Sequence, residues 1–131
     1  MARVEDLLPL VDVLSLHVPL LPSTKDLINL ENMRAMKPTA ILINTARGGV
    51  INEPDLFCAL REGIIASAGI DAFVIEPPTA QAYGDNLEIP TLTFSPHIGA
   101  APSEIQTALC MSMCDHMAEL LNGDTPRDRV A

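Results

Sequence analysis

Four short apolar runs divide the chain, at residues 11–18, 40–43, 65–70 and 91–94. Within these runs the apolar residues tend to follow one another instead of alternating with polar ones. That pattern is typical of strands that are covered on both faces in a parallel sheet. Proline, glycine or polar residues follow each run and mark the end of a strand. The pattern therefore predicts four buried, parallel strands.

Segments of helical length lie between and after these runs. Asn29 can cap a helix over residues 30–36, and Asn52 can cap a helix over Glu53–Arg61. A third helix is expected over residues 103–122, because its apolar side chains recur on one broad face at about 100° per residue. These side chains are Ile105, Leu109, Met113, Met117, Leu120 and Leu121.

The alternation of strands and helices predicts an α/β protein. We expect a partial doubly wound, Rossmann-type parallel sheet of about four strands, with flanking helices and a long C-terminal helix. The whole chain of 131 residues is expected to form one domain. Residues 76–90 are rich in proline and polar residues, so an irregular surface loop is expected there.

Polar side chains cluster just after the predicted strands. Arg47 follows the second strand, Asp71 and Glu76 follow the third, and His97 follows the fourth. The carboxyl ends of parallel strands share one edge of the sheet, and ligands of open α/β sheets bind at that edge. The sequence therefore predicts that an arginine, a carboxylate and a histidine meet at one site.

These three residue types suit the chemistry of 2-oxo and 2-hydroxy acids. A guanidinium is a two-pronged donor that can bind a carboxylate and polarise a neighbouring carbonyl. An imidazole can give or accept a proton near neutral pH, and a carboxylate beside it favours the protonated form. Arg47 with the pair of Glu76 and His97 supplies what such a redox reaction needs apart from the carrier of the hydride.

Four segments of the sequence resemble the NAD-binding domain of the D-isomer-specific 2-hydroxyacid dehydrogenases, and within that family the D-3-phosphoglycerate dehydrogenases most. The segments are VDVLSLHVPLLPST, MKPTAILINTARGGVINE, AGIDAFVIEPP and SPHIGAA. The resemblance implies hydride transfer between NAD and a D-2-hydroxy acid or 2-oxo acid. It assigns substrate binding to Arg47, acid–base catalysis to His97 and the role of its partner to Glu76.

The same resemblance implies a set of cofactor contacts, with Asp71 at the nicotinamide carboxamide. The residues are Val18, Pro19, Thr24, Thr45, Ala46, Arg47, Asp71, His97, Gly99 and Ala100. From the residues alone, Thr24 serves equally well in a turn, and His17 is expected to be a packed, hydrogen-bonded histidine. Cys110 and Cys114 are expected to be buried thiols, and no metal site is expected.

The sequence contains no G-x-G-x-x-G turn, which the family uses to bind the pyrophosphate. We therefore expect the C-terminal part of a dinucleotide-binding domain, without the first βαβ units and the substrate domain, and inactive on its own. Whether NAD or NADP is used stays open, as do two alternatives. These are a truncated, non-catalytic relic or oligomerisation module, and an NAD-sensing relative that resembles a corepressor.

Charge and composition narrow the possible partners. Seventeen acidic against eight basic residues give a net charge of -9, which argues against binding to nucleic acid. No apolar run reaches the roughly 18 residues of a membrane helix.

Three cysteines suit a reducing compartment, so a cytoplasmic protein is expected. The strand at residues 11–18 is expected to be an exposed edge through which the chain forms a homo-oligomer.

Overall fold

The computed structural model describes residues 3–99 and 102–126 of the chain. The chain divides into two compact units, Met1–His97 and Ile98–Ala131.

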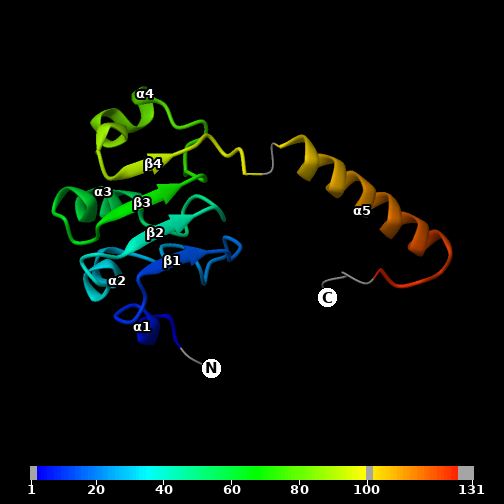
Figure 1. Cartoon of the computed structure of the whole chain (residues 1–131), viewed down its shortest axis with the longest axis horizontal. Coiled ribbons are helices and arrows are strands. Elements are labelled where there is room, and N and C mark those ends of the chain that lie inside the picture. The colour runs from blue at the N-terminus through cyan, green and yellow to red at the C-terminus, as the bar shows by residue number, and fades with distance from the viewer. Residues whose placement is uncertain (1–2, 100–101, 127–131) are drawn as a thin grey trace. The chain divides into compact units, whose positions relative to one another are not determined.

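The first unit is built on a parallel sheet of four strands in the order β1-β2-β3-β4 (Figure 1). The strands are β1 (Val13–Leu16), β2 (Ile41–Asn44), β3 (Ser67–Ile70) and β4 (Leu92–Phe94). In register, Leu16 pairs with Asn44, Asn44 with Ile70, and Ile70 with Phe94. The four strands therefore end level with one another, which places the residues that follow them on a common edge.

The expected fold class is confirmed, and one strand forms at each of the four apolar runs. Strands β1, β3 and β4 are shorter than their runs, whereas β2 is as long as its run and lies one residue later, ending at Asn44. A short helix, α1 (Val4–Leu7), precedes β1 and was not predicted. Leu8 follows this helix and is 1% exposed, so the leucine-rich start contributes to the core.

The first two predicted helices are confirmed together with their caps. In α2 (Leu30–Ala35) the Asn29 side chain accepts a hydrogen bond from the Asn32 N–H. In α3 (Glu53–Arg61) the Asn52 side chain accepts one from the Asp55 N–H. The two helices pack against each other, and the Asp55 carboxylate also accepts a hydrogen bond from the Leu30 N–H at 2.9 Å.

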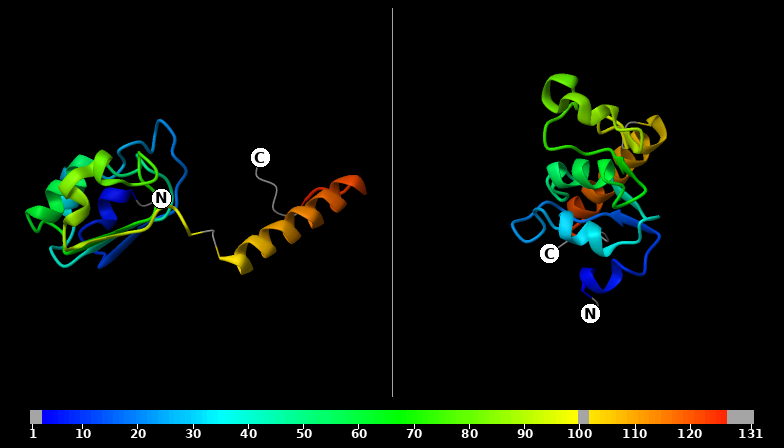
Figure 2. Two further views of the ribbon diagram at one scale, coloured as in Figure 1. Left: turned by 90° about the horizontal axis from the view of Figure 1, so that it is seen from above. Right: turned by 90° about the vertical axis from the view of Figure 1, so that its left-hand side faces the viewer.

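The two faces of the sheet differ in burial. Leu42, Ala68 and Ile70 point to the covered face and are buried, whereas Val13 is 51% exposed and Ile41 is 38% exposed. Helices α2 and α3 lie on the same side of the strands (Figure 2), as right-handed crossovers in one direction require. The prediction that both faces are covered is therefore wrong for the described part of this unit.

The segment 76–90 is more regular than expected. It contains α4 (Ala80–Tyr83) and the 3-10 helix η1 (Gly84–Glu88). Tyr83 is only 8% exposed, and its ring packs edge-on against Phe73 at 5.1 Å and Phe57 at 6.1 Å between centroids. Two elements of four and five residues are too short to produce a periodic pattern, so the sequence did not reveal them.

The second unit contains the long helix α5 (Ser103–Leu121), as predicted. None of its residues is buried in the described structure. Cys110 and Cys114 are exposed on it, so the expectation of buried thiols is wrong for the described residues. Among the described residues, no helix combines the length and the apolar character that crossing a membrane requires.

Candidate active site

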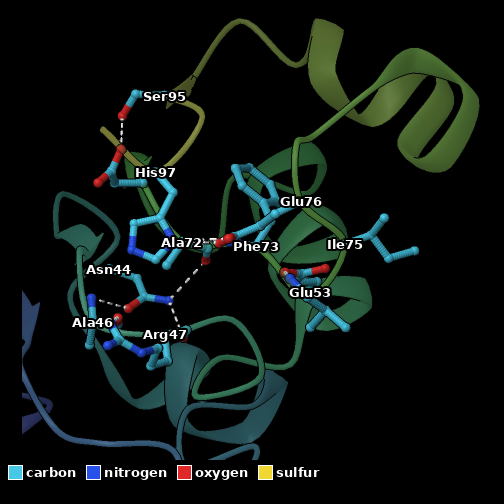
Figure 3. Close-up of polar contacts among 12 residues, drawn as sticks. Asn44, Ala46, Arg47, Glu53, Ala72, Phe73, Ile75, Glu76, Ser95 and His97 are labelled. Carbon is cyan, nitrogen blue, oxygen red and sulfur yellow. Dashed lines mark hydrogen bonds and ion pairs between the residues drawn. The ribbon is translucent and has the colours of Figure 1, made fainter. Parts of the chain in front are cut away.

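Asn44, the last residue of β2, shapes the turn that carries Arg47. Its side chain is buried, with the residue only 2% exposed. The Asn44 Nδ2 donates to the carbonyl oxygens of Arg47 at 3.0 Å and Ala72 at 3.4 Å, and its Oδ1 accepts from the Ala46 N–H at 3.0 Å (Figure 3). One amide therefore closes the turn after β2 and joins it to the chain that leaves β3.

Two glycines follow Arg47 and allow the turn to approach the chain after β3. A Cβ atom at Gly48 would overlap the Phe73 carbonyl and the Val74 nitrogen. Gly49 has a φ of 82°, in the left-handed region that favours glycine. Both glycines and Arg47 line a cavity of about 920 Å³.

Glu76 and His97 form an ion pair at the same cavity. The His97 Nδ1 lies 3.0 and 2.9 Å from the two carboxylate oxygens of Glu76 (Figure 3). A carboxylate can only accept hydrogen bonds, so Nδ1 is the donor and Nε2 remains for proton exchange. His97 has a φ of 58°, an uncommon backbone angle for a residue with a side chain.

The electrostatics of the pair favour the ionised carboxylate. The hydrogen bond from His97 holds the pKa of Glu76 below its usual value, and the hydrogen bond from the Phe73 N–H acts in the same direction. The side chains of His97 and Glu76 are 39% and 36% exposed. The imidazole is therefore held by a carboxylate and still open to the cavity.

The structure thus brings together the three residues that the sequence assigned to catalysis. Arg47, Glu76 and His97 follow β2, β3 and β4 in turn, and all three line the cavity of about 920 Å³. Arg47 is exposed, and its Nη1 donates to the Ala46 carbonyl at 2.7 Å. Their juxtaposition is a property of the fold, whereas their catalytic roles remain predictions.

Half of the predicted cofactor contacts lie at a neighbouring cavity of about 500 Å³. Its lining includes Val18, Pro19, Thr45, Ala46 and Arg47. His17 also lines it; this residue is hydrogen-bonded to Ser15 at 2.8 Å, as expected, but it is exposed and not packed.

Thr24 has a defined structural role. Its hydroxyl donates to the Pro19 carbonyl at 2.6 Å and accepts from the Leu21 N–H at 2.8 Å. These bonds hold the turn after Pro19, which favours the turn function that the sequence left open. A cofactor contact of Thr24 stays a prediction.

Asp71 lies directly after β3 and is 8% exposed. Its carboxylate accepts a hydrogen bond from the Ser95 hydroxyl (Figure 3). Asp71 and Thr45 line a further cavity of about 280 Å³.

Gly99 belongs to the second unit, and Ala100 lies outside the described residues. The proposed cofactor contacts of these two residues therefore stay predictions.

Two further residues lie near the site, and no pattern in the sequence predicted them. The Glu53 Oε1 accepts from the Val74 N–H at 2.7 Å, and its Oε2 accepts from the Tyr83 hydroxyl at 3.0 Å. Burial raises the pKa of Glu53 and also that of Tyr83. Glu53 and Tyr83 are 30 residues apart in the sequence, so no local sequence pattern predicts their contact.

The described residues fit the nicotinamide end of a dinucleotide. Buried Asp71 offers a carboxylate acceptor for an amide, and Val18 and Pro19 supply apolar wall at the adjoining cavity. The sequence has no glycine-rich turn for a pyrophosphate. Among the described residues, no group of three or more His, Cys, Asp or Glu side chains is arranged to hold a metal ion.

A parallel sheet with polar side chains at the carboxyl ends of its strands is typical of ligand-binding α/β domains. The chain belongs to the D-isomer specific 2-hydroxyacid dehydrogenases, because the model of their NAD binding domain matches residues 1–99. It is similar to glycerate dehydrogenase of Methylorubrum extorquens, at 40% identity over 119 residues. It is also 40% identical over 113 residues to D-3-phosphoglycerate dehydrogenase 2 of Arabidopsis thaliana.

The structure is similar to that of D-lactate dehydrogenase with NAD⁺ from Lactobacillus jensenii, with a TM-score of 0.80 and 26% identity. That alignment covers 99% of this chain and 42% of the other. The matches to the Methylorubrum and Arabidopsis enzymes cover 91% and 86% of this chain but only 38% and 18% of those proteins. The chain therefore corresponds to a part of these relatives.

Proposed function

We propose that this chain supplies the acid–base and carboxylate-binding side of the active site of an NAD-dependent D-2-hydroxyacid dehydrogenase. The observation that supports the proposal most strongly is that Arg47 lines the same cavity as the ion pair of Glu76 and His97. The substrate class is a short 2-hydroxy acid or its 2-oxo acid. Glycerate and 3-phosphoglycerate are the first candidates, because similar enzymes bear their names.

Arg47 has the donors that substrate binding needs. A guanidinium carries five N–H donors, and the bond to the Ala46 carbonyl occupies only one nitrogen of Arg47. The remaining donors can bind a carboxylate with two parallel hydrogen bonds. A bound carboxylate would then lie in the cavity that His97 also lines.

His97 has the position and the partner of a general acid and base. Its Nδ1 donates to Glu76, so its Nε2 can give a proton to the substrate oxygen during reduction and remove one during oxidation. Glu76 fixes the orientation of the ring and the proton on Nδ1.

Val18, Pro19, Thr45, Ala46 and Asp71 would hold the nicotinamide end of NAD. When bound, NAD supplies the acceptor or donor of the two electrons that oxidation or reduction at the substrate requires.

The proposal is tested by turnover of the complete protein with NAD(H) and a panel of short 2-oxo and 2-hydroxy acids. His97→Gln is expected to lower kcat by about 10²–10⁴-fold, the usual contribution of a positioned acid–base group. Arg47→Ala is expected to lower kcat/KM by about 10–100-fold, as the loss of a charged hydrogen bond does. Matched controls are His116→Gln on α5 and Arg61→Ala at the end of α3, which should keep the turnover of the unmodified protein. Turnover of the His97 and Arg47 variants within a few fold of the unmodified protein would contradict the proposal.

A further inference from the structure

The loop of residues 73–76, which leads from β3 to Glu76, is held by its backbone. Three consecutive N–H groups each donate to a side chain. The Phe73 N–H donates to the Glu76 Oε1 at 3.1 Å. The next two donate to the Glu53 Oε1 at 2.7 Å and to the Tyr83 hydroxyl at 2.8 Å.

The side chains in the middle of this loop do not hold it in place. Val74 is 62% exposed and Ile75 is 54% exposed, so packing of these side chains contributes little. Phe73 is 3% exposed and fixes only the start of the loop. The path from Phe73 to Glu76 therefore depends on the hydrogen bonds to Glu53 and Tyr83.

The two acceptors are themselves joined and come from rigid elements. The Tyr83 hydroxyl donates to the Glu53 Oε2 at 3.0 Å while it accepts from the Ile75 N–H. Glu53 begins α3, and Tyr83 ends α4 with its ring packed on Phe57 and Phe73. The loop is thus held between the two helices, and Phe73, Val74 and Glu76 of the loop line the cavity of about 920 Å³.

We propose that Glu53 and Tyr83 are positioning residues that hold the 73–76 loop so that the Glu76 carboxylate meets the His97 imidazole. Neither residue is assigned to touch the substrate. They act through the backbone N–H groups of Val74 and Ile75, and then through Glu76. The consequence for turnover rests on the proposed function, whereas the consequence for the loop does not.

The charges at the loop support a positioning role for Glu53. Glu53 and Glu76 repel each other, and Asp71 adds to the repulsion at Glu76. Tyr83 and the Val74 N–H face Glu53, while His97 and the Phe73 N–H face Glu76. A second carboxylate beside the ion pair is unfavourable unless its hydrogen bonds to the loop offset the repulsion.

The first test is a double-mutant cycle in the complete protein. Tyr83→Phe keeps the ring and removes the hydroxyl, and it is expected to lower kcat about 10-fold with little change in KM, since a misplaced group can cost up to about 10²-fold. In a Glu76→Gln background the same substitution is expected to change kcat less than twofold, because its effect passes through Glu76. Glu53→Gln should behave like Tyr83→Phe, while Glu31→Gln, an exposed glutamate in the first turn of α2, is the matched control.

The second test needs no turnover and uses NMR on this chain. Glu53→Gln should move the amide signal of Val74, and Tyr83→Phe should move that of Ile75 and raise the titration midpoint of the Glu76 carboxyl carbon. If these signals respond but the complete protein turns over no 2-oxo acid, the proposed function fails and the positioning role stands. If the amide signals do not respond, or Tyr83→Phe lowers kcat equally with and without Glu76, the positioning role is overturned.

Discussion

The side chain of Asn44 joins the ends of two strands at this site by hydrogen bonds. Its buried amide contacts the backbone of Ala46, Arg47 and Ala72. Asn44→Ala leaves these backbone groups without their partner. We expect it to lower the free energy of unfolding by about 1–3 kcal/mol, the cost of unsatisfied buried polar groups. Urea unfolding measures this loss, and Asn122→Ala at the end of α5 is the control. A loss no larger than that of the control would contradict the role of Asn44.

Gly48 is a second residue whose identity is set by its neighbours. A side chain at this position would overlap the backbone of Phe73 and Val74. Gly48→Ala is therefore expected to destabilise the chain by about 1–3 kcal/mol and to displace the 73–76 loop. Gly69→Ala is the matched control, because its Cβ would meet only Ile43 at 4.0 Å. Equal thermal unfolding midpoints of the two variants would contradict this interpretation.

The sequence predicted some site residues and missed others for a physical reason. Arg47, Glu76 and His97 lie within a few residues of the ends of β2, β3 and β4, so the level ends of a parallel sheet predicted that they lie near one another. Glu53 lies on α3 and Tyr83 on α4, and the tertiary fold brings both side chains to the site. A contact of that kind depends on packing between distant segments, which residue order alone does not reveal.

Among the elements, the sequence predicted the starts of the helices better than the bounds of the strands and the burial of the sheet faces. The caps at Asn29 and Asn52 are short-range hydrogen bonds, so α2 and α3 begin where the sequence indicated. Strands β1, β3 and β4 are shorter than their apolar runs, because these runs include residues outside the ladders. The face of the sheet that carries Val13 and Ile41 is more open than the apolar runs suggested.

The edge of the sheet gives a prediction about association. Within the described residues β1 pairs only with β2, and Val13 on it is 51% exposed. An exposed apolar edge strand is a template for pairing with another chain. We expect this chain to self-associate with rising concentration in sedimentation velocity, and Val13→Lys to shift it toward the monomer. Monomeric behaviour at all concentrations would contradict the prediction, as would an equal shift with Leu109→Lys on α5.

At the scale of the whole molecule, the ion pair links stability to pH. The pKa of Glu76 is lower in the folded chain than its ordinary value of 4.5. Its contribution to stability is therefore present above pH 4.5 and is lost as the pH falls through the folded pKa. The difference in urea midpoint between the unmodified chain and Glu76→Gln should shrink in that range. The effect should be small, because both side chains are more than a third exposed. A difference that stays constant down to strongly acidic pH would contradict it.

The level ends of the four parallel strands, together with the hydrogen bonds that hold the 73–76 loop, bring the carboxylate of Glu76 to the imidazole of His97. The most direct measurement is an NMR titration of the Glu76 carboxyl carbon in the unmodified chain, in His97→Gln and in the control His116→Gln. We predict a midpoint below 4.5 in the unmodified chain and in the control, and a higher midpoint once His97 is replaced. The same midpoint in all three chains would contradict this contact, because it would mean that the two side chains do not meet.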